Sequence, residues 1–365
     1  MTMSEQFTKI NDGLLVRAPG KINLSLLVKG KREDGYHDIE TLMAKVNWYD
    51  EILIENVARD SCLVTRSSDP CLRHTGAGER RATSDGAAIE LICKGEHKVP
   101  EGEDNLVYKA AKLILETARQ KTEDGGQKTE DGGRRTEDGE QRTEVGRRRT
   151  EDIRISGNQD TAVKITLTKN VPAGSGLGSG SSDAAATLMG INKFFKLGLG
   201  KRELTGLAAK LGSDVAFFLD GPLALCTGRG EKVKKLAKCE FRVLLVVPNV
   251  SVSTQRVYEN YRHDEARYRR LREEINVYIE KKRIDLACRM CANMLQESCF
   301  ELHTELRELK KRIESLGVRP VCLSGSGSSM FCIINNSNEE GVKAYRDMLE
   351  RDYGCKSIIV KNNSW

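Results

Sequence analysis

Apolar and polar residues follow one another along the chain in patterns that predict both strands and helices. Stretches rich in aliphatic and β-branched residues, bounded by turn formers, predict strands over 14–18, 21–30, 50–57, 161–169, 223–228, 241–248 and 355–361. Apolar residues at helical spacing predict helices over 105–118, 181–195 and 202–212, and in stretches between 254 and 316. The order of these elements predicts the α+β class.

Two segments interrupt this pattern. Residues 58–87 are polar and irregular, and over 119–155 a Lys/Arg-Thr-Glu triplet recurs every seven residues. A heptad repeat forms a coiled coil only where two positions of each repeat are apolar, and between Arg119 and Asp152 the only aliphatic residue besides glycine is Val145. Such a segment cannot bury enough apolar surface to offset its ordering entropy. We therefore expect 119–155 to be a low-complexity, disordered insertion.

The length of the chain is sufficient for two packed domains. It has 365 residues, of which 39% are hydrophobic, and a chain of this size commonly divides into two cores. The composition changes between 228 and 238. We therefore predict an N-terminal domain over 1–228 and a C-terminal domain over 229–365.

The charge balance argues against a nucleic-acid partner. The chain has 59 Lys and Arg residues against 53 Asp and Glu residues, so its net charge of +6 is mild for this length. Dedicated nucleic-acid binders are usually more one-sided. The arginine-rich stretch 267–272 leaves an RNA-binding surface open as an alternative, although Glu273 and Glu274 follow it directly. Binding of RNA through this surface would weaken steeply with salt.

The sequence also predicts where the protein works. Its first residues lack the apolar stretch of a secretion signal, and the apolar run 243–247 is too short to cross a bilayer. We therefore expect a cytoplasmic protein with no membrane partner. The 11 cysteines are odd in number, which favours reduced thiols over a disulfide framework.

One group of cysteines has the spacing of a structural zinc site: Cys288, Cys291, Cys299 and His303. The residues around them form the apolar face of a predicted helix, where a buried cysteine packs as a small hydrophobe. This second interpretation is favoured, so no metal ligand is assigned, and the zinc site stays an open alternative.

The stretch V-P-A-G-S-G-L-G-S-G-S-S-D-A-A over 171–185 carries the strongest functional signal. It joins a predicted strand to a predicted helix, where free N–H groups and the helix dipole favour an anion. Glycines let phosphate oxygens approach the main chain closely, and a simple tight turn would need only one or two of them. The stretch fits neither the P-loop nor the dinucleotide-binding fingerprint, because no lysine follows the last glycine and position 179 is serine.

Three stretches in the same order along the chain resemble the motifs of the GHMP kinases. A-P-G-K-I-N-L over 18–24 resembles their first motif, the glycine-rich stretch their second, and L-S-G-S-G-S-S-M-F over 323–331 their third. The resemblance implies a two-domain fold, with an N-terminal ribosomal-protein-S5-like domain and a C-terminal ferredoxin-like domain. It also implies that ATP binds through the second motif and Asn105, at Pro172, Ala173, Gly174, Ser175, Gly176, Leu177, Gly178, Ser179, Gly180, Ser181 and Ser182.

Within this superfamily the chain is most similar to the kinases that phosphorylate the 2-hydroxyl of a cytidylylated methylerythritol. The resemblance covers nearly the whole chain except 58–87 and 119–155, and Ser175 and Ser179 depart from the usual alanine and glycine. It implies that Asp214 accepts the proton of the attacking hydroxyl and that Lys21 stabilises the developing charge. Without the motifs around them, a surface lysine and a helix cap would be the simpler interpretations.

The resemblance also implies a binding site for cytosine and sugar: Tyr36, His37, Tyr258, Thr254 and Asn23. Structural roles remain equally open for Tyr258, Asn23 and Asn105. Magnesium is the expected metal of the nucleotide, with Ser181 as the one candidate ligand from its place in the loop. The partner is a small molecule, and we expect a monomer or a weak homodimer. Other GHMP kinases, for homoserine, mevalonate or a sugar, and an inactive kinase fold remain alternatives.

Overall fold

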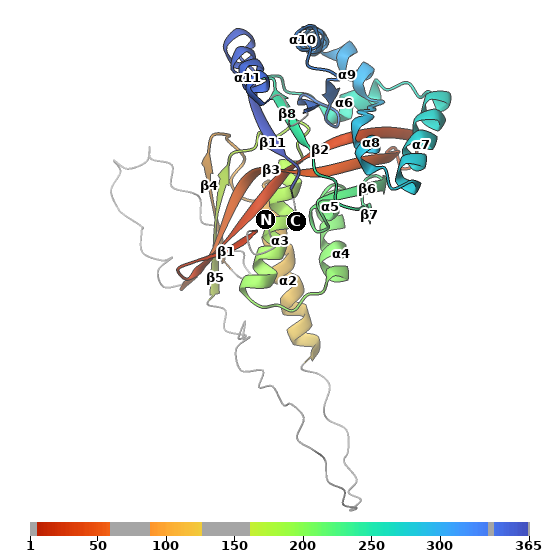
Figure 1. Cartoon of the computed structure of the whole chain (residues 1–365). Coiled ribbons are helices and arrows are strands. Elements are labelled where there is room, and N and C mark those ends of the chain that lie inside the picture. The colour runs from red at the N-terminus through yellow and green to blue at the C-terminus, as the bar shows by residue number, and fades with distance from the viewer. Residues whose placement is uncertain (1–5, 59–87, 126–160, 335–338, 364–365) are drawn as a thin grey trace, which may run out of the picture.

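The computed structural model describes residues 6–58, 88–125, 161–334 and 339–363 (Figure 1). Within these residues, seven strands form the first sheet. They are β1 (Phe7–Ile10), β2 (Gly13–Lys31), β3 (His37–Ala58), β4 (Ala88–Gly95), β5 (Thr161–Lys169), β6 (Leu223–Gly228) and β7 (Lys232–Lys235). The strands lie in the order β1-β2-β3-β5-β4, and β3 also pairs with β6, which pairs with β7. Only β4 and β5 of these strands pair in parallel.

Four helices pack on the first sheet. They are α2 (Leu106–Gly125), α3 (Ser179–Phe194), α4 (Lys201–Leu211) and α5 (Val215–Phe218). Their buried residues share one core with the strands, which includes alanines of α3 together with Val16 and Ile54. The small side chains let α3 approach the sheet closely: a Cβ at Gly190 would lie 2.8 Å from Val16.

A second, antiparallel sheet of four strands follows in the order β11-β8-β10-β9. Its strands are β8 (Arg242–Val247), β9 (Cys322–Leu323), β10 (Met330–Ile334) and β11 (Lys356–Lys361). The helices of this half are α6 (Thr254–Glu259), α7 (Glu265–Glu280), α8 (Ile284–Arg289), α9 (Gln296–Leu302), α10 (Thr304–Ser315) and α11 (Glu339–Tyr353). They lie in the upper part of Figure 1, where α7 and α8 contact β2 and α11 contacts β11.

The long hairpin of β2 and β3 connects the two halves. Ile22 and Leu24 of β2 lie in a core with Val243, Leu245 and Phe331 of the second sheet. Both faces of β2 are thereby covered, which explains its continuous run of buried residues from Ala18 to Val28. A strand buried on both faces shows an apolar run instead of alternation. The two predicted strands, 14–18 and 21–30, are one strand in the structure, which continues through Pro19 and Gly20.

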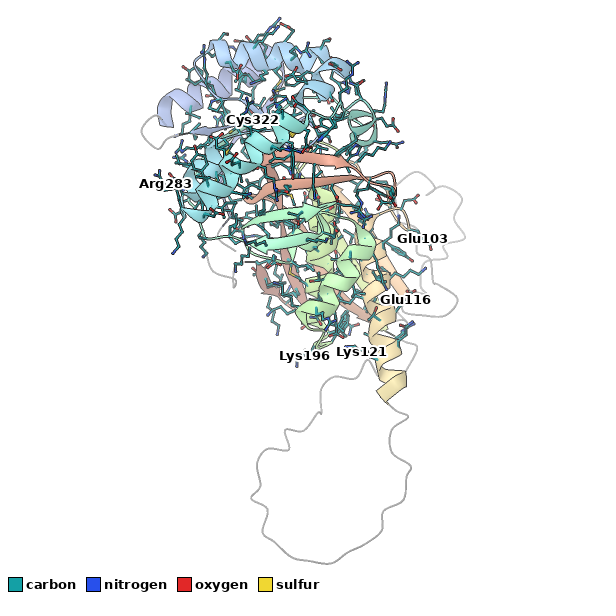
Figure 2. The ribbon with its side chains drawn as sticks, turned by 90° about the vertical axis from the view of Figure 1, so that its right-hand side faces the viewer. Glu103, Glu116, Lys121, Lys196, Arg283 and Cys322 are labelled. Atoms are coloured by element: carbon teal, nitrogen blue, oxygen red, sulfur yellow. The ribbon has the colours of Figure 1, made fainter. Side chains whose placement is uncertain are left out.

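The structure confirms the mixed α and β composition and adds elements that the pattern did not predict, β4 and β7. The helix predicted over 105–118 continues to Gly125, into the predicted insertion 119–155. Lys121 near the lower end of α2 forms an ion pair with Glu203 of α4, which supports this extension (Figure 2). The rest of that insertion, 126–155, and nearly all of 58–87 lie outside the described residues.

The predicted domain boundary at 228 stays a prediction. The first sheet includes β7, so the chain passes to the second sheet between Lys235 and Arg242. Of the helices in the described part of the chain, none combines the length and the apolar character needed to span a membrane.

Candidate active site

The glycine-rich stretch forms a loop between β5 and α3 with backbone angles that favour glycine. Gly174, Gly176 and Gly178 have φ angles of 69°, 80° and 65°, in the left-handed region where a Cβ is unfavourable. A Cβ at Gly176 would collide with the carbonyl oxygen of Ser324 and lie 2.8 Å from that of Gly327. A Cβ at Gly178 would lie 2.9 Å from Cε of Lys21. The glycines therefore allow both the turn and the close approach of two other segments.

The loop ends at the amino terminus of α3, where Gly178 provides no side-chain cap. The hydroxyl of Ser182, in the first turn, is buried and has no hydrogen-bond partner among the described residues. The hydroxyls of Ser175 and Ser179 instead donate to the carbonyl of Pro172, at 2.8 and 3.3 Å. These two serines, which depart from the usual motif, thus stabilise the loop itself. The amino terminus of α3 offers dipole, N–H groups and an unpaired hydroxyl to an anion.

The third motif packs directly on this loop. The hydroxyl of the fully buried Ser324 donates to the carbonyl of Gly176 at 3.0 Å, and the N–H of Ser329 donates to the carbonyl of Ser175, also at 3.0 Å. The sequence analysis singled out this stretch as a motif but assigned no residue in it. Only the packing of the two loops in the structure identifies Ser324 and Ser329 as residues that join them.

Lys21 and Asp214 lie side by side next to the glycine loop. Their Nζ and Oδ2 atoms are 3.8 Å apart, and Nζ of Lys21 donates to the carbonyl of Gly176 at 3.0 Å. Burial lowers the pKa of Lys21, and the charge of Asp214 opposes that shift. Asp214 stands at the amino end of α5, but its carboxylate makes no capping hydrogen bond. The alternative interpretation of Asp214 as a helix cap therefore lacks its defining contact.

Irregularities in β2 direct the two polar side chains of the first motif to this place. The pairing of β2 with β3 shifts register between Pro19 and Lys21 and again between Asn23 and Ser25; such bulges re-aim side chains. Asn23 accepts a short hydrogen bond from Lys21 and donates to the hydroxyl of Thr41 at 2.8 Å. The amide of Asn23 thus holds the ammonium of Lys21 in place.

A buried charge cluster that the sequence analysis missed lies behind the loop. Lys169, at the end of β5, donates to Asp50 at 2.5 Å and to Asp183 of α3 at 2.7 Å. Burial alone would lower the pKa of Lys169, but the charges of Asp183 and Asp50 outweigh it and raise that pKa. Asp50 also accepts from the N–H groups of Asn170 and Val171, at 2.6 and 2.8 Å. The cluster therefore fixes the start of the loop to β3 and α3.

A second missed residue, Lys45, holds the other end of α5. This lysine is 2% exposed and donates to the carbonyls of Phe218 and Asp220, at 3.0 and 2.6 Å. Burial lowers the pKa of Lys45 to about 7, against the opposing charge of Asp220. Because α5 is a single turn that begins beside Asp214, this contact contributes to the position of the Asp214 carboxylate.

Aromatic residues from both halves of the chain meet near the tip of the β2–β3 hairpin. The ring of His37 lies 5.0 Å from that of Tyr258 at an interplanar angle of 30°, and 6.2 Å from that of Tyr261 at 84°. Burial lowers the pKa of His37, assisted by the charge of Lys31. Burial also raises the pKa of Tyr258, and the charge of Asp214 adds to that shift. Asp214 thus lies near enough to Tyr258 for its charge to act on the phenol.

Three predicted residues have less direct places. Tyr36 is 58% exposed, and Thr254 at the start of α6 shares a hydrogen bond of 2.8 Å with Ser326 of the third motif. The side chain of Asn105 is engaged with its own segment: it donates to the carbonyl of Pro100 at 2.7 Å and accepts from the N–H of Val107 at 2.9 Å. Asn105 therefore caps α2, the structural alternative that the sequence left open.

The cysteines of the zinc alternative have separate neighbours. Cys288 is hydrogen-bonded to Cys239, and Cys291 is hydrogen-bonded to Cys322. Figure 2 shows Cys322 in the upper half of the molecule. The ring of His303 contacts Glu305 at 3.3 Å. Among the residues with described positions, no group of three or more His, Cys, Asp or Glu side chains is arranged to hold a metal ion.

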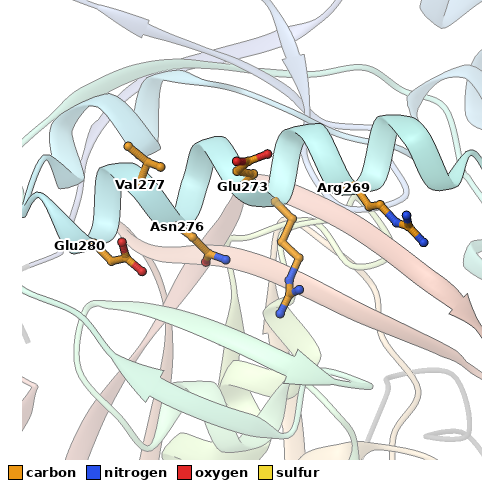
Figure 3. A pocket seen from close by; sticks show the side chains of 6 residues that line it. Arg269, Glu273, Asn276, Val277 and Glu280 are labelled. Atoms are coloured by element: carbon orange, nitrogen blue, oxygen red, sulfur yellow. The ribbon is translucent and has the colours of Figure 1, made fainter.

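The arginine-rich stretch lies on α7, where carboxylates accompany its charges. Arg269 pairs with Glu265 at 2.6 Å and Arg272 with Glu40 at 2.9 Å. A hollow of 430 Å³ runs along this helix, lined by Arg269, Arg272, Glu273, Asn276, Val277 and Glu280 (Figure 3). It contains none of the site residues above, and its mixed charges do not form a basic surface for RNA.

Comparison with known proteins places this geometry in a family. Residues 147–222 match the GHMP kinases N terminal domain, and residues 275–353 match the GHMP kinases C terminal domain. A 4-diphosphocytidyl-2-C-methyl-D-erythritol kinase of Bacillus mycoides (strain KBAB4) is 30% identical over 326 residues, 89% of each chain. The corresponding protein of Bacillus cereus (strain B4264) is 31% identical over the same share.

Solved structures agree with this placement. A crystal structure of 4-(cytidine 5'-diphospho)-2C-methyl-D-erythritol kinase matches 96% of this chain and 100% of its own, with a TM-score of 0.62 and 26% identity. Homoserine kinase from Cytophaga hutchinsonii ATCC 33406 matches with a TM-score of 0.60 over 98% and 96% of the two chains, but at 16% identity it supports the fold alone. The two-domain GHMP kinase fold is thereby confirmed, and the protein is an ATP-dependent small-molecule kinase. The chain belongs to the GHMP kinases and, within them, to the family of 4-diphosphocytidyl-2-C-methyl-D-erythritol kinases.

Proposed function

We propose that this protein transfers the γ-phosphate of ATP to the 2-hydroxyl of 4-diphosphocytidyl-2-C-methyl-D-erythritol. The products are the 2-phosphate and ADP, in the non-mevalonate route to isoprenoid precursors. One observation carries the proposal: the Lys21–Asp214 pair, 3.8 Å apart, lies at the glycine loop and also within electrostatic range of Tyr258 in the aromatic group. A phosphate site and a base-binding site thus share one reacting pair.

Asp214 is the general base in this proposal. Its carboxylate does not cap α5, so it is free to accept the proton of the attacking hydroxyl. Lys21 adds a positive charge 3.8 Å away, which stabilises negative charge on the transferred phosphoryl group. Phosphoryl transfer requires mainly such positioning and charge stabilisation.

The glycine loop and the amino terminus of α3 hold the phosphates of ATP. Three glycines with positive φ leave the main chain bare, and the buried hydroxyl of Ser182 has no partner within the described chain. These groups fit a polyanion. Magnesium, which we include as the metal of the nucleotide, would neutralise charge on the phosphates when bound. Ser181 remains its proposed ligand. Asn105, beside the loop through α2, is kept as a residue that shapes the adenine end through the cap of this helix.

The aromatic group holds the cytosine. His37 and Tyr258 lie 5.0 Å apart and contact each other, so a base that stacks beside them finds one flat face and one ring with two nitrogens for hydrogen bonds. Because burial lowers the pKa of His37, its imidazole is neutral at physiological pH, with one donor and one acceptor. Tyr36 contributes a second aromatic face, and Thr254 and Asn23 contribute polar contacts along the substrate.

Parallel assays of ADP release test the proposal. The purified protein is given ATP and magnesium with 4-diphosphocytidyl-2-C-methyl-D-erythritol, methylerythritol phosphate, mevalonate or homoserine. We expect turnover with the first acceptor alone, and its loss in His37→Ala. Turnover with another acceptor would agree with a kinase activity but would refute the cytosine site. Cytoplasmic location and a monomeric or weakly dimeric state stay predictions of the sequence.

A further inference from the structure

Arg229 lies in the turn between β6 and β7, in a position that the proposed mechanism does not yet use. Its neighbours Gly228 and Gly230 have φ angles of 74° and 118°, so the turn is sharp and the arginine stands at its tip. The guanidinium lies 5.0 Å from the centroid of the Tyr36 ring. A guanidinium over an aromatic face is held there by a cation–π interaction.

Arg229 differs from the other arginines nearby in its lack of an ion pair within the described chain. Arg32 pairs with Asp34 and Asp38 at 2.9 and 3.0 Å, and Arg272 pairs with Glu40 at 2.9 Å. Within the described chain, no carboxylate forms an ion pair with the guanidinium of Arg229. Glu231 accepts from its backbone N–H, at 2.7 Å. The guanidinium is thus half-buried and held on an aromatic ring, and the charge of Asp34 acts on it only from a distance, without an ion pair.

The same turn also reaches the reacting pair. A Cβ placed on Gly230 would lie 3.5 Å from Oδ1 of Asp214. The turn that carries Arg229 therefore reaches both Tyr36, at the proposed cytosine end, and Asp214, at the proposed reacting end. In the proposed substrate, a diphosphate links the cytidine to the sugar alcohol whose hydroxyl reacts. A diphosphate that joins these two ends lies along the turn that carries Arg229.

We propose that Arg229 binds the diphosphate of the substrate and makes the protein selective for a nucleoside diphosphate ester over the free nucleoside. The planar guanidinium presents paired N–H donors that match two phosphate oxygens. The ring of Tyr36 orients the guanidinium before substrate arrives, which limits the entropy lost on binding. This inference rests on the proposed function, since it assumes that cytidine occupies the aromatic group.

Calorimetric titrations with cytidine 5'-diphosphate and with cytidine test the inference on the full chain. We expect the unaltered protein to bind the diphosphate more tightly than the nucleoside. Arg229→Gln should lower the affinity for cytidine 5'-diphosphate by about tenfold to a hundredfold, the range of a hydrogen bond to a charged group. The affinity for cytidine should stay unchanged. Arg229→Lys should keep part of the preference. Arg283→Gln, which removes an exposed arginine paired with Asp285 on α8, is the matched control and should bind like the unaltered protein.

The outcomes separate the two proposals. If Arg229→Gln and Arg229→Lys retain the full preference for the diphosphate, the role of Arg229 is refuted while the cytosine site stands. If the unaltered protein binds neither ligand, the proposed function is refuted and the role of Arg229 with it. The Michaelis constant for ATP should be the same in all variants. A change in this constant would show that Arg229 contributes to binding of ATP, which would contradict the proposal.

Discussion

The two ends of the site are built in different ways. At the phosphate end, backbone and buried polar groups are in contact: Lys21 is 4% exposed, Ser324 is fully buried, and Gly176 leaves no room for a Cβ. At the nucleoside end, side chains from the β2–β3 turn and from α6 face one another, and Tyr36 is 58% exposed. The phosphate end is preformed and leaves no room for an added atom at Gly176. The nucleoside end consists of flat aromatic side chains on which a base can stack.

This difference follows from the two ligands. A phosphate group is recognised by many short hydrogen bonds from main-chain N–H groups, which requires exact placement of the backbone. A base is recognised by its flat face and a few edge contacts, which aromatic side chains provide with less demand on the backbone. Substitutions at the phosphate end should therefore affect chemistry and nucleotide binding. Substitutions at the nucleoside end should affect only the second substrate.

The largest effect is expected from Asp214→Asn. Loss of the general base should lower kcat by about 10²–10⁴, while binding of ATP persists because the glycine loop is untouched. Steady-state kinetics and a titration with a non-hydrolysable ATP analogue measure the two quantities. Normal turnover in this variant would remove Asp214 from the mechanism. Loss of nucleotide binding would show instead that the carboxylate organises the phosphate end.

Gly176→Ala should come next. An alanine at this position must adopt a φ of 80°, and its methyl group collides with the third motif. Strain of this kind amounts to about 2–4 kcal/mol. We expect kcat/KM for ATP to fall about a hundredfold, with KM for the second substrate little changed. Gly174→Ala is the matched control, because Gly174 lies in the same loop with a similar φ of 69° but has nothing within 4 Å of the added Cβ. If both variants behave alike, backbone strain and not the contact with Ser324 matters.

Tyr258→Ala should have a smaller and more selective effect. Loss of a stacking face for cytosine should raise KM for the second substrate about tenfold, with KM for ATP unchanged. Tyr258→Phe keeps the ring and should stay close to the unaltered protein. An equal loss in both variants would assign the contribution to the phenol group beside Asp214. A rise in KM for ATP would erase the distinction between the two ends.

The sequence predicted the phosphate end better than the nucleoside end because glycine spacing is a local signal. Strand, loop and helix around 171–185 follow from neighbouring residues, and the structure places them as predicted. The contact between Ser324 and Gly176 joins segments that are 148 positions apart. No local pattern specifies such a pair, so the resemblance located the third motif without indicating its contacts.

Buried charges were the main residues that the sequence could not reveal. A lysine is ordinarily expected to be exposed, yet Lys45 and Lys169 are 2% and 1% exposed. Their burial depends on the carbonyls and carboxylates that β3, α3 and α5 bring to them. Such partners exist only after the sheet and helices have packed, which is why the apolar pattern identified the core but not these lysines.

The smallest expected effect concerns stability at the phosphate end. The pKa of Lys45 falls from its ordinary 10.5 to about 7 in the folded protein, so between pH 7 and pH 10.5 the unfolded chain binds a proton that the folded chain does not. Stability must then rise with pH in this window, by about 1 kcal/mol between pH 7 and pH 8. Urea unfolding at several pH values should show this gain in the unaltered protein relative to Lys45→Met. The exposed Lys234→Met should show no such pH-dependent difference. A flat difference for Lys45→Met as well would mean that Lys45 stays protonated, and that its two carbonyl contacts stabilise the ammonium enough to offset burial.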